Sequence, residues 1–401
     1  MSLLSPKTSL SLTLLVLWAA NIGTARAATS TRQFREWYPQ YGWIFRNITL
    51  TNCSDEYERY LTGYKNHSEI DYLGGGGIYT ALTQPVINCI LKNTSEYLKG
   101  CMTGSQVLLG IMPTVLALLG PSHNEIALLA NVGRRPLLAL GLALSSPSTY
   151  FSRAFEYSDP KEIMSHHKNR REQRCPEGRG WQLLITCVEY ALTAGACFNA
   201  VNNSIQVGTM SISSVMSDFD FFAALWLFLG VAVHIFSCFV LRLRLRGWRD
   251  PTANECVQRG TNRQEKQSPR GIAKPGTNGA ESFWLWIMGT WPRMKEIFCT
   301  EFFPCAAKQY DVRIVTFQET KKFLVAAWWE STFTILHVVF GTLVFSSLLF
   351  LGIKDALSIV GRYMASVALC RVILMYELAG LRERCITIDG EKVKRSLDDT
   401  F

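Results

Sequence analysis

The chain is poor in charged residues for its length. Asp, Glu, Lys and Arg make up 18% of its 401 residues, whereas 48% are hydrophobic, and the mean hydropathy is +0.10. This balance argues against a purely soluble protein and makes lipid one of the expected solvents. We predict a mainly α, multi-pass helical membrane protein with about five spans and a small N-terminal luminal or extracellular domain.

The sequence also lacks the short motifs of common enzyme families. It has no Ser-His-Asp signature, HExxH pair or dinucleotide fingerprint, although triads can assemble from distant residues. The four glycines 74–77 lack the Lys of a nucleotide loop, and we interpret them as a flexible connector. His166 and His167 have no cysteine or carboxylate cluster beside them. We predict no cofactor and no metal, and leave catalysis open.

Positive charge is concentrated beside the later hydrophobic runs. Residues 28–104 contain seven basic and seven acidic residues, whereas 242–322 contain fifteen basic and eight acidic ones. Basic loops of this kind are retained in the cytosol, so the net charge of +9 indicates membrane orientation and not nucleic-acid binding. We expect the lipid bilayer as a partner, leave membrane-protein partners open, and predict no nucleic-acid partner.

Acceptor sequons for N-glycosylation have the opposite distribution. Four of them precede the first long hydrophobic run and a fifth follows the second predicted span, at Asn47, Asn52, Asn66, Asn93 and Asn202. Because glycans are added in the secretory lumen, we expect a luminal or extracellular N-terminal domain and a cytosolic C-terminus. The expected location is the plasma membrane or a membrane of the secretory pathway.

Residues 1–27 have the organisation of a signal peptide. Lys7 precedes the apolar run Leu10–Ala20, and Ala25–Ala27 has the A-x-A form of a cleavage site. A short uncleaved anchor is the alternative. The rest of the chain is predicted to begin with a luminal domain (28–104), followed by three spans (105–241) with a cytosolic basic hairpin or loop near 121–180. A disordered cytosolic linker (242–282) and an interfacial aromatic and basic segment (283–322) come next. Two more spans (323–380) and a cytosolic tail (381–401) complete the prediction.

The hydrophobic runs give approximate bounds for the spans. They are Gln106–Gly120, Trp181–Val201, Phe219–Leu241, Phe323–Ile353 and Leu357–Leu378. Between the first two, Asn124–Ser146 is interrupted by Gly133-Arg134-Arg135-Pro136. A charged pair before a proline is unfavourable at the bilayer centre, so we expect a cytosolic re-entrant hairpin or an interfacial helix. A further span beginning at Pro136 stays open.

Three of the twelve cysteines belong to the predicted luminal domain. Cys53, Cys89 and Cys101 would form one disulfide and leave one thiol, with Cys197 as a fourth candidate. The pairing is left open.

Ionisable residues inside the spans are the default site candidates, because isolated charges there are costly. We group six of them as a candidate intramembrane polar cavity: Glu189, His234, Glu330, His337, Arg371 and Glu377. Glu330 and His337 are seven residues apart and could share a helix face, although Glu330 follows two tryptophans and could be interfacial. The long side chains of Arg362 and Arg371 could snorkel to the membrane surface. At the start of the third span, we expect Asp218 and Asp220 to cap that helix.

One stretch resembles known proteins. The residues Leu108–Ser122, Asn124–Leu129 and Arg134–Leu140 resemble a segment of uncharacterised multi-pass integral membrane proteins of filamentous fungi. This resemblance implies a fungal membrane protein and supplies no catalytic residue. We expect a binding, sensing or accessory component; a transporter or channel for a small solute and a membrane-embedded enzyme acting on a hydrophobic metabolite are the alternatives.

Overall fold

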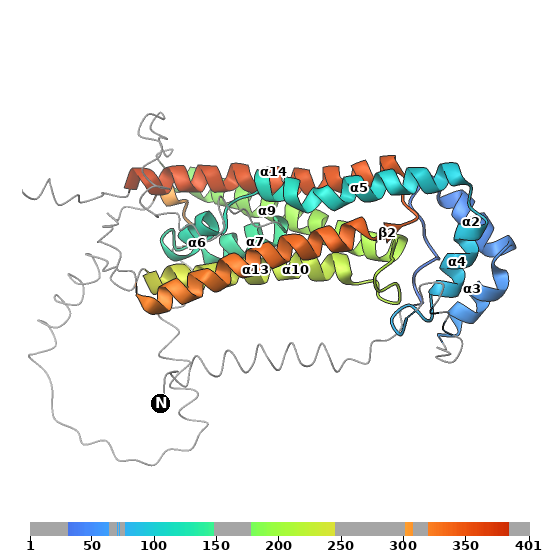
Figure 1. Cartoon of the computed structure of the whole chain (residues 1–401). Coiled ribbons are helices and arrows are strands. Elements are labelled where there is room, and N and C mark those ends of the chain that lie inside the picture. The colour runs from blue at the N-terminus through green and yellow to red at the C-terminus, as the bar shows by residue number, and fades with distance from the viewer. Residues whose placement is uncertain are drawn as a thin grey trace, which may run out of the picture. The chain divides into compact units, whose positions relative to one another are not determined.

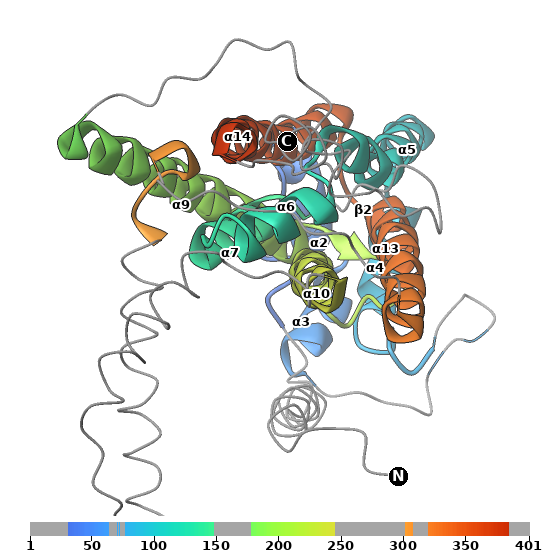
Figure 2. The ribbon, with the colours of Figure 1, turned by 90° about the vertical axis from the view of Figure 1, so that its left-hand side faces the viewer.

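The computed structural model describes residues 31–63, 70, 72, 77–147, 178–244, 301–307 and 320–384. The predicted signal peptide, Asn66, the histidine pair, most of the linker and interfacial segment, and nearly all of the tail lie outside these residues. Within them the chain forms ten α-helices, one short 3-10 helix and one pair of two-residue strands (Figures 1 and 2). The predicted mainly helical fold is confirmed.

The chain divides into two compact units. The first combines residues 1–110, 205–223 and 344–357, and the second combines residues 111–204, 224–343 and 358–401.

The first unit is built on three short helices, α2 (Gly42–Thr51), α3 (Ser54–Leu61) and α4 (Gln84–Lys92). Strand β1 (Ile212–Ser213) pairs antiparallel with β2 (Leu348–Leu349). An aromatic and aliphatic core joins these pieces, and Phe350 contacts both Trp37 and Phe45 within it, with ring centroids 5.5 and 5.2 Å apart. Because its sequence is discontinuous, this unit is larger than the 28–104 domain predicted.

Among the residues that the structure describes, five helices are long and apolar enough to cross a membrane, which confirms the predicted number of spans by length and composition. They are α5 (Glu96–Leu119), α9 (Arg179–Met210), α10 (Phe222–Arg244), α13 (Lys321–Ser346) and α14 (Ile353–Arg384). The outward faces of α9 and α13 carry exposed apolar side chains, among them Leu184, Val188, Leu192, Val325, Leu336 and Val339. Such surfaces suit lipid better than water.

Several helix ends differ from the predicted span bounds. Helix α5 begins ten residues before Gln106, and α14 continues six residues beyond Leu378. Helix α9 continues nine residues beyond Val201, to Met210. The fourth span does not run to Ile353, because α13 ends at Ser346 and Phe350 adopts a left-handed backbone with φ 63° before α14 begins. Buried Ser347 bonds to Ser213 across the strand pair at 2.8 Å between hydroxyl oxygens. A hydropathy pattern cannot detect this turn, since the residues around it are apolar.

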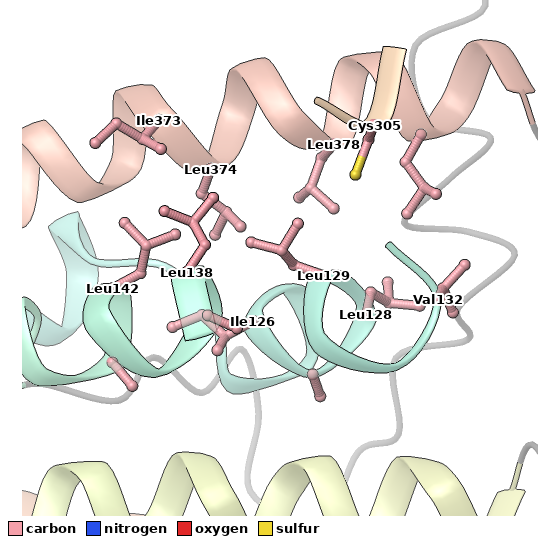
Figure 3. Packing of buried hydrophobic residues seen from close by; sticks show 14 of the residues in the cluster. Ile126, Leu128, Leu129, Val132, Leu138, Leu142, Cys305, Ile373, Leu374 and Leu378 are labelled. Atoms are coloured by element: carbon pink, nitrogen blue, oxygen red, sulfur yellow. The ribbon is translucent and has the colours of Figure 1, made fainter. Parts of the chain in front are cut away.

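The interrupted stretch 124–146 forms two short helices, α6 (His123–Asn131) and α7 (Pro136–Ser145). At 1.5 Å per residue neither can cross a core of about 30 Å, so the alternative of a further span from Pro136 is wrong. The Ser122 and Glu125 side chains form a reciprocal capping box at the start of α6, and Pro136 occupies the first turn of α7. Both helices pack their leucines against α14 (Figure 3).

Candidate functional site

The six predicted polar residues all lie in the second unit, and five of them are buried. Glu189, Glu330 and His337 are about 5% exposed or less, and His234 and Glu377 are 1% exposed. The expectation that Glu330 is merely solvated at an interface is therefore not met. The structure places the six residues in three groups, each completed by residues that the sequence reasoning did not select.

The first group surrounds Arg135, whose side chain is fully buried at the N-cap of α7. Its Nη1 lies 2.6 Å from Glu189 Oε2 on α9 and 2.8 Å from Glu377 Oε1 on α14. Its Nε donates to the backbone carbonyl of Glu301 at 3.1 Å. One guanidinium thus joins the helix hairpin, two long helices and the segment that contains the 3-10 helix η3 (Cys305–Ala307).

The neighbours of Arg135 keep it charged. Burial by itself lowers the pKa of Arg135, but the charges and hydrogen bonds of Glu377 and Glu189 outweigh burial and raise it above its usual value. The Tyr190 ring lies beside the same guanidinium, with 5.8 Å from Cζ to the ring centroid. Arg135 is therefore a permanent positive charge inside the second unit.

Glu301 completes this Arg135 cluster, which we define as Arg135, Glu189, Tyr190, Glu301 and Glu377. Glu301 is fully buried, and its Oε1 accepts the backbone N–H of Leu138 at 3.0 Å and the Tyr190 hydroxyl at 2.5 Å. Leu138 is the third residue of α7, so Glu301 caps that helix and faces the positive end of its dipole.

Arg135 alone does not balance the carboxyl groups of the cluster, because Glu189 and Glu377 share its guanidinium and Glu301 supplies a third carboxyl group. Glu377 Oε2 also accepts the backbone N–H of Cys305 at 3.2 Å. Arg135 Nη2 and one oxygen of each carboxyl group (Glu189 Oε1, Glu301 Oε2 and Glu377 Oε1) are buried without a hydrogen-bond partner among the described residues, although Glu377 Oε1 lies 2.8 Å from Arg135 Nη1. Unpaired buried polar atoms cost about 1–3 kcal/mol each. The cluster can therefore accept a proton or a small polar group that satisfies them.

The second group contains His234, Glu330 and His337, together with His123. His123 Nε2 lies 3.2 Å from Glu330 Oε1, and His234 is within electrostatic reach of His123 and His337. His337 stacks on Trp226, with ring centroids 5.4 Å apart, and its Nε2 lies 2.9 Å from the Trp226 carbonyl oxygen. Glu330 and His337 therefore have different partners, and the structure gives no direct proton path between them.

The third group is a single ion pair. Arg371 on α14 contacts Glu125, the residue that also closes the capping box of α6. The Arg371 side chain is 37% exposed. The sequence-based prediction grouped Arg371 with Glu189 and Glu377 in one candidate cavity, but the arginine that contacts those two carboxyl groups is Arg135.

The sequence reasoning missed Arg135, Glu301, His123 and Glu125 because each stands outside the five predicted spans. Arg135 was assigned to a polar interruption, and Glu301 to an interfacial segment. One sequence signal for Arg135 was available. It stands directly before a proline that starts a strongly apolar helix. A basic residue in that position can be buried at the helix N-terminus if carboxylates from other helices reach it.

In the first unit, Cys53 and Cys89 form a disulfide with a Cα–Cα distance of 5.9 Å. This confirms the predicted disulfide bond and resolves its pairing. Cys101 is the remaining thiol, 3.7 Å from the Tyr41 hydroxyl, and Cys197 donates to the Gly141 carbonyl at 3.1 Å. Glu56 lies within 4.8 Å of both disulfide sulfurs, but sulfurs bonded to each other cannot serve as thiolate ligands for a metal.

The described sequons differ in exposure. Asn47, Asn52 and Asn93 are exposed on the first unit, and Asn52 Nδ2 lies 3.4 Å from Asn93 Oδ1. Asn202 is half-buried within α9, and its acceptor serine, Ser204, is buried and bonded to the Tyr363 hydroxyl at 2.7 Å.

Comparison of the chain with family models, with curated proteins and with solved structures finds no match. Its function must therefore be inferred from the residues themselves.

Proposed function

We propose that this chain is an integral membrane protein that acts as a binding or sensing component, with the Arg135 cluster as its site. The observation that carries the proposal is that the carboxyl groups of Glu189 and Glu377 and the backbone carbonyl of Glu301 all contact one fully buried arginine. Apolar packing alone can hold helices together, and buried charges are expensive even when paired. Ionisable groups kept inside membrane helices usually mark a site.

We further propose that the N-terminal part is luminal or extracellular and glycosylated, that the C-terminus is cytosolic, and that a signal peptide precedes the domain. Exposed sequons at Asn47, Asn52 and Asn93 support this orientation, as does the disulfide, which forms in oxidising compartments. In the second unit, the basic end of α10, the start of α13 and the end of α14 lie at one end of the bundle (Figure 1). That arrangement suits a cytosolic face.

Glycosidase mapping of the full chain in a eukaryotic host tests the orientation. Treatment with peptide N-glycosidase should increase electrophoretic mobility, and a sequon moved into 250–282 should stay unmodified. Modification of the moved sequon would reverse the assignment.

A ligand panel on the purified full-length chain in detergent tests the site. The panel contains monovalent and divalent cations, short carboxylic acids and small amines. A bound probe stabilises the folded state, by about 2.7 kcal/mol at a hundredfold excess over Kd, and this raises the unfolding temperature. We expect the effect of an active probe to disappear in Glu189→Gln and to persist in Glu125→Gln, whose carboxyl belongs to the separate pair with Arg371. Loss of response in both variants, or in neither, would exclude the Arg135 cluster as the site.

Transport of a small solute is the second candidate. The observation that favours it is the broken helix pair α6–α7, whose second helix directs its N-terminus at Glu301. Interrupted helices of this kind line binding sites in transporters, and their N-termini bind anionic groups. Proteoliposomes with an enclosed pH-sensitive dye separate the two functions. Solute-driven dye signals that are lost in Glu377→Gln support transport, whereas binding without any signal supports sensing.

A fungal origin, membrane-protein partners and an enzymatic role on a hydrophobic metabolite stay predictions from the sequence.

A further inference from the structure

Glu189 and Glu377 reach the same atom from different helices. Both contact Nη1 of Arg135, at 2.6 and 2.8 Å, and their carboxyl groups lie close enough to interact directly. Two carboxylates at such short range repel each other when both are ionised, whereas a single proton converts the repulsion into a hydrogen bond.

The other charged and titratable groups around the pair do not remove this repulsion. Glu301 is a carboxyl group and supplies no positive charge, and its Oε1 is already occupied by Tyr190 and by the N-terminus of α7. Cys305 contributes a backbone N–H to Glu377 and no charge. Among the described residues that interact with the pair, Arg135 is therefore the one compensating cation, and it balances one carboxylate.

Each carboxyl group of the pair has one oxygen that is buried without a hydrogen-bond partner in the described part of the chain, Glu189 Oε1 and Glu377 Oε1. The other oxygens are bonded, Glu189 Oε2 to Arg135 Nη1 and Glu377 Oε2 to the Cys305 amide. A proton on Glu189 Oε1 that is donated to Glu377 Oε1 would give both oxygens a partner and leave one negative charge for the arginine.

We propose that Glu189 and Glu377 bind one proton between them beside Arg135, so that the ligand of the Arg135 cluster is a proton. This inference rests on the proposed function and names its ligand. When the proton leaves to water, the carboxyl O–H bond breaks and a second carboxylate appears between α9 and α14. The packing of these two helices then depends on pH.

Infrared difference spectroscopy of the purified full-length chain in lipid nanodiscs tests the proton directly. On passing from mildly acidic to alkaline solution, the native chain should lose one carbonyl stretching band of a buried, protonated carboxyl group. We expect this band to be absent in Glu189→Gln and in Glu377→Gln and to remain in the control Glu125→Gln. Survival of the band in both cluster variants would overturn the proposal.

Thermal unfolding provides a second readout that needs no spectroscopic assignment. A glutamine mimics a protonated glutamate, so each single variant should keep most of the native unfolding temperature and lose its decline at alkaline pH. The double variant Glu189→Gln/Glu377→Gln leaves Arg135 without a counter-charge from the pair, and its unfolding temperature should fall by much more than the two single shifts combined. If the fall in unfolding temperature of the double variant equalled the sum of the two single falls, both carboxylates would be ionised in the native chain, and this would contradict the proposal.

A metal cation at the same oxygens is the competing occupant. If the unfolding temperature of the native chain rises with sodium or potassium concentration at fixed pH and no carboxyl band titrates, the proton assignment is wrong although the binding function stands. If the band titrates and no solute of the ligand panel acts, the proton site stands and solute binding is excluded.

Discussion

The carboxylate of Asp218 binds Thr83, the residue that precedes α4. Its Oδ1 accepts the Thr83 hydroxyl at 3.0 Å and the Thr83 backbone N–H at 3.2 Å, and the Leu82 N–H approaches the same oxygen at 3.3 Å. Asp218 therefore supports the start of a helix that lies far earlier in the chain. The prediction that it caps the following helix, α10, is wrong.

Replacing Asp218 by alanine should loosen the start of α4. A lost cap costs about 0.5–2 kcal/mol, and the buried Leu82 and Thr83 amides lose their acceptor as well. We expect faster hydrogen exchange at these amides, measured by mass spectrometry on the purified full-length chain. The exposed Asp55 is the control, because Asp55→Ala should stay within about 0.5 kcal/mol of the native stability. Equal protection of Leu82 and Thr83 in both variants would show that the Asp218 bonds contribute nothing.

The Asp218 and Arg135 contacts show what the sequence can and cannot predict. Hydrophobic runs locate the long helices well, since burial in lipid requires about 20 apolar residues in succession. The partners of single polar residues depend on which helices become neighbours. That arrangement is set by packing between segments more than a hundred residues apart, so periodicity within one segment does not contain it. For this reason the sequence could group Arg371 with Glu189 and Glu377 as polar residues of the spans but could not show that its partner is Glu125.

Cysteine positions were more informative than charged ones. The three cysteines of the predicted N-terminal domain permit only three pairings, and the observed Cys53–Cys89 bond links the N-cap of α3 to α4. The bound at Ile353 failed because the turn between α13 and α14 lies in largely apolar sequence, whereas the bound at Val201 failed because α9 continues through the polar residues 202–204.

Loss of the Cys53–Cys89 disulfide should destabilise the first unit. Removing a native disulfide from a small domain typically costs about 2–5 kcal/mol. We expect Cys53→Ser and Cys89→Ser each to reduce the yield of folded protein and to expose one new thiol to alkylation, counted by intact mass. Cys101→Ser should leave both quantities near native, since the Cys101 sulfur takes no part in the disulfide and its hydrogen bond from the Tyr41 hydroxyl is long, at 3.7 Å. A destabilisation by Cys101→Ser as large as that by Cys53→Ser would argue for exchange between alternative disulfides.

Two glycines give a matched test of helix packing in the second unit. A Cβ at Gly341 on α13 would collide with the indole of Trp226, which is fully buried, whereas a Cβ at Gly361 on α14 meets no atom within 4 Å. We expect Gly341→Ala to cost about 1–3 kcal/mol through overpacking. Gly361→Ala should be neutral or stabilise by up to about 1 kcal/mol, because alanine favours a helix over glycine. Unfolding temperatures in detergent compare them, and equal shifts would refute the close contact.

The five sequons should not be modified equally. Asn47, Asn52 and Asn93 are exposed, whereas Asn202 lies inside the candidate span α9 and Ser204 is buried against Tyr363. Removing each exposed asparagine by mutation to glutamine should produce one step in gel mobility, and Asn202→Gln should produce none. A glycan on Asn202 would mean that this part of α9 is in the lumen when the transferase acts.

Arg135→Gln should be the most damaging single change in the second unit. It leaves Glu189 and Glu377 buried without their cation, and removing one partner of a buried ion pair typically costs about 3–5 kcal/mol. We expect a large loss of folded protein in size-exclusion chromatography after solubilisation. Arg242→Gln, at an exposed position of α10, is the control and should behave as native. The triple variant Arg135→Gln/Glu189→Gln/Glu377→Gln removes all three charges and should recover much of the loss, because neutral polar groups of the same shape need no counter-charge. If the triple variant is as unstable as Arg135→Gln alone, the damage comes from lost shape or hydrogen bonds and not from uncompensated charge.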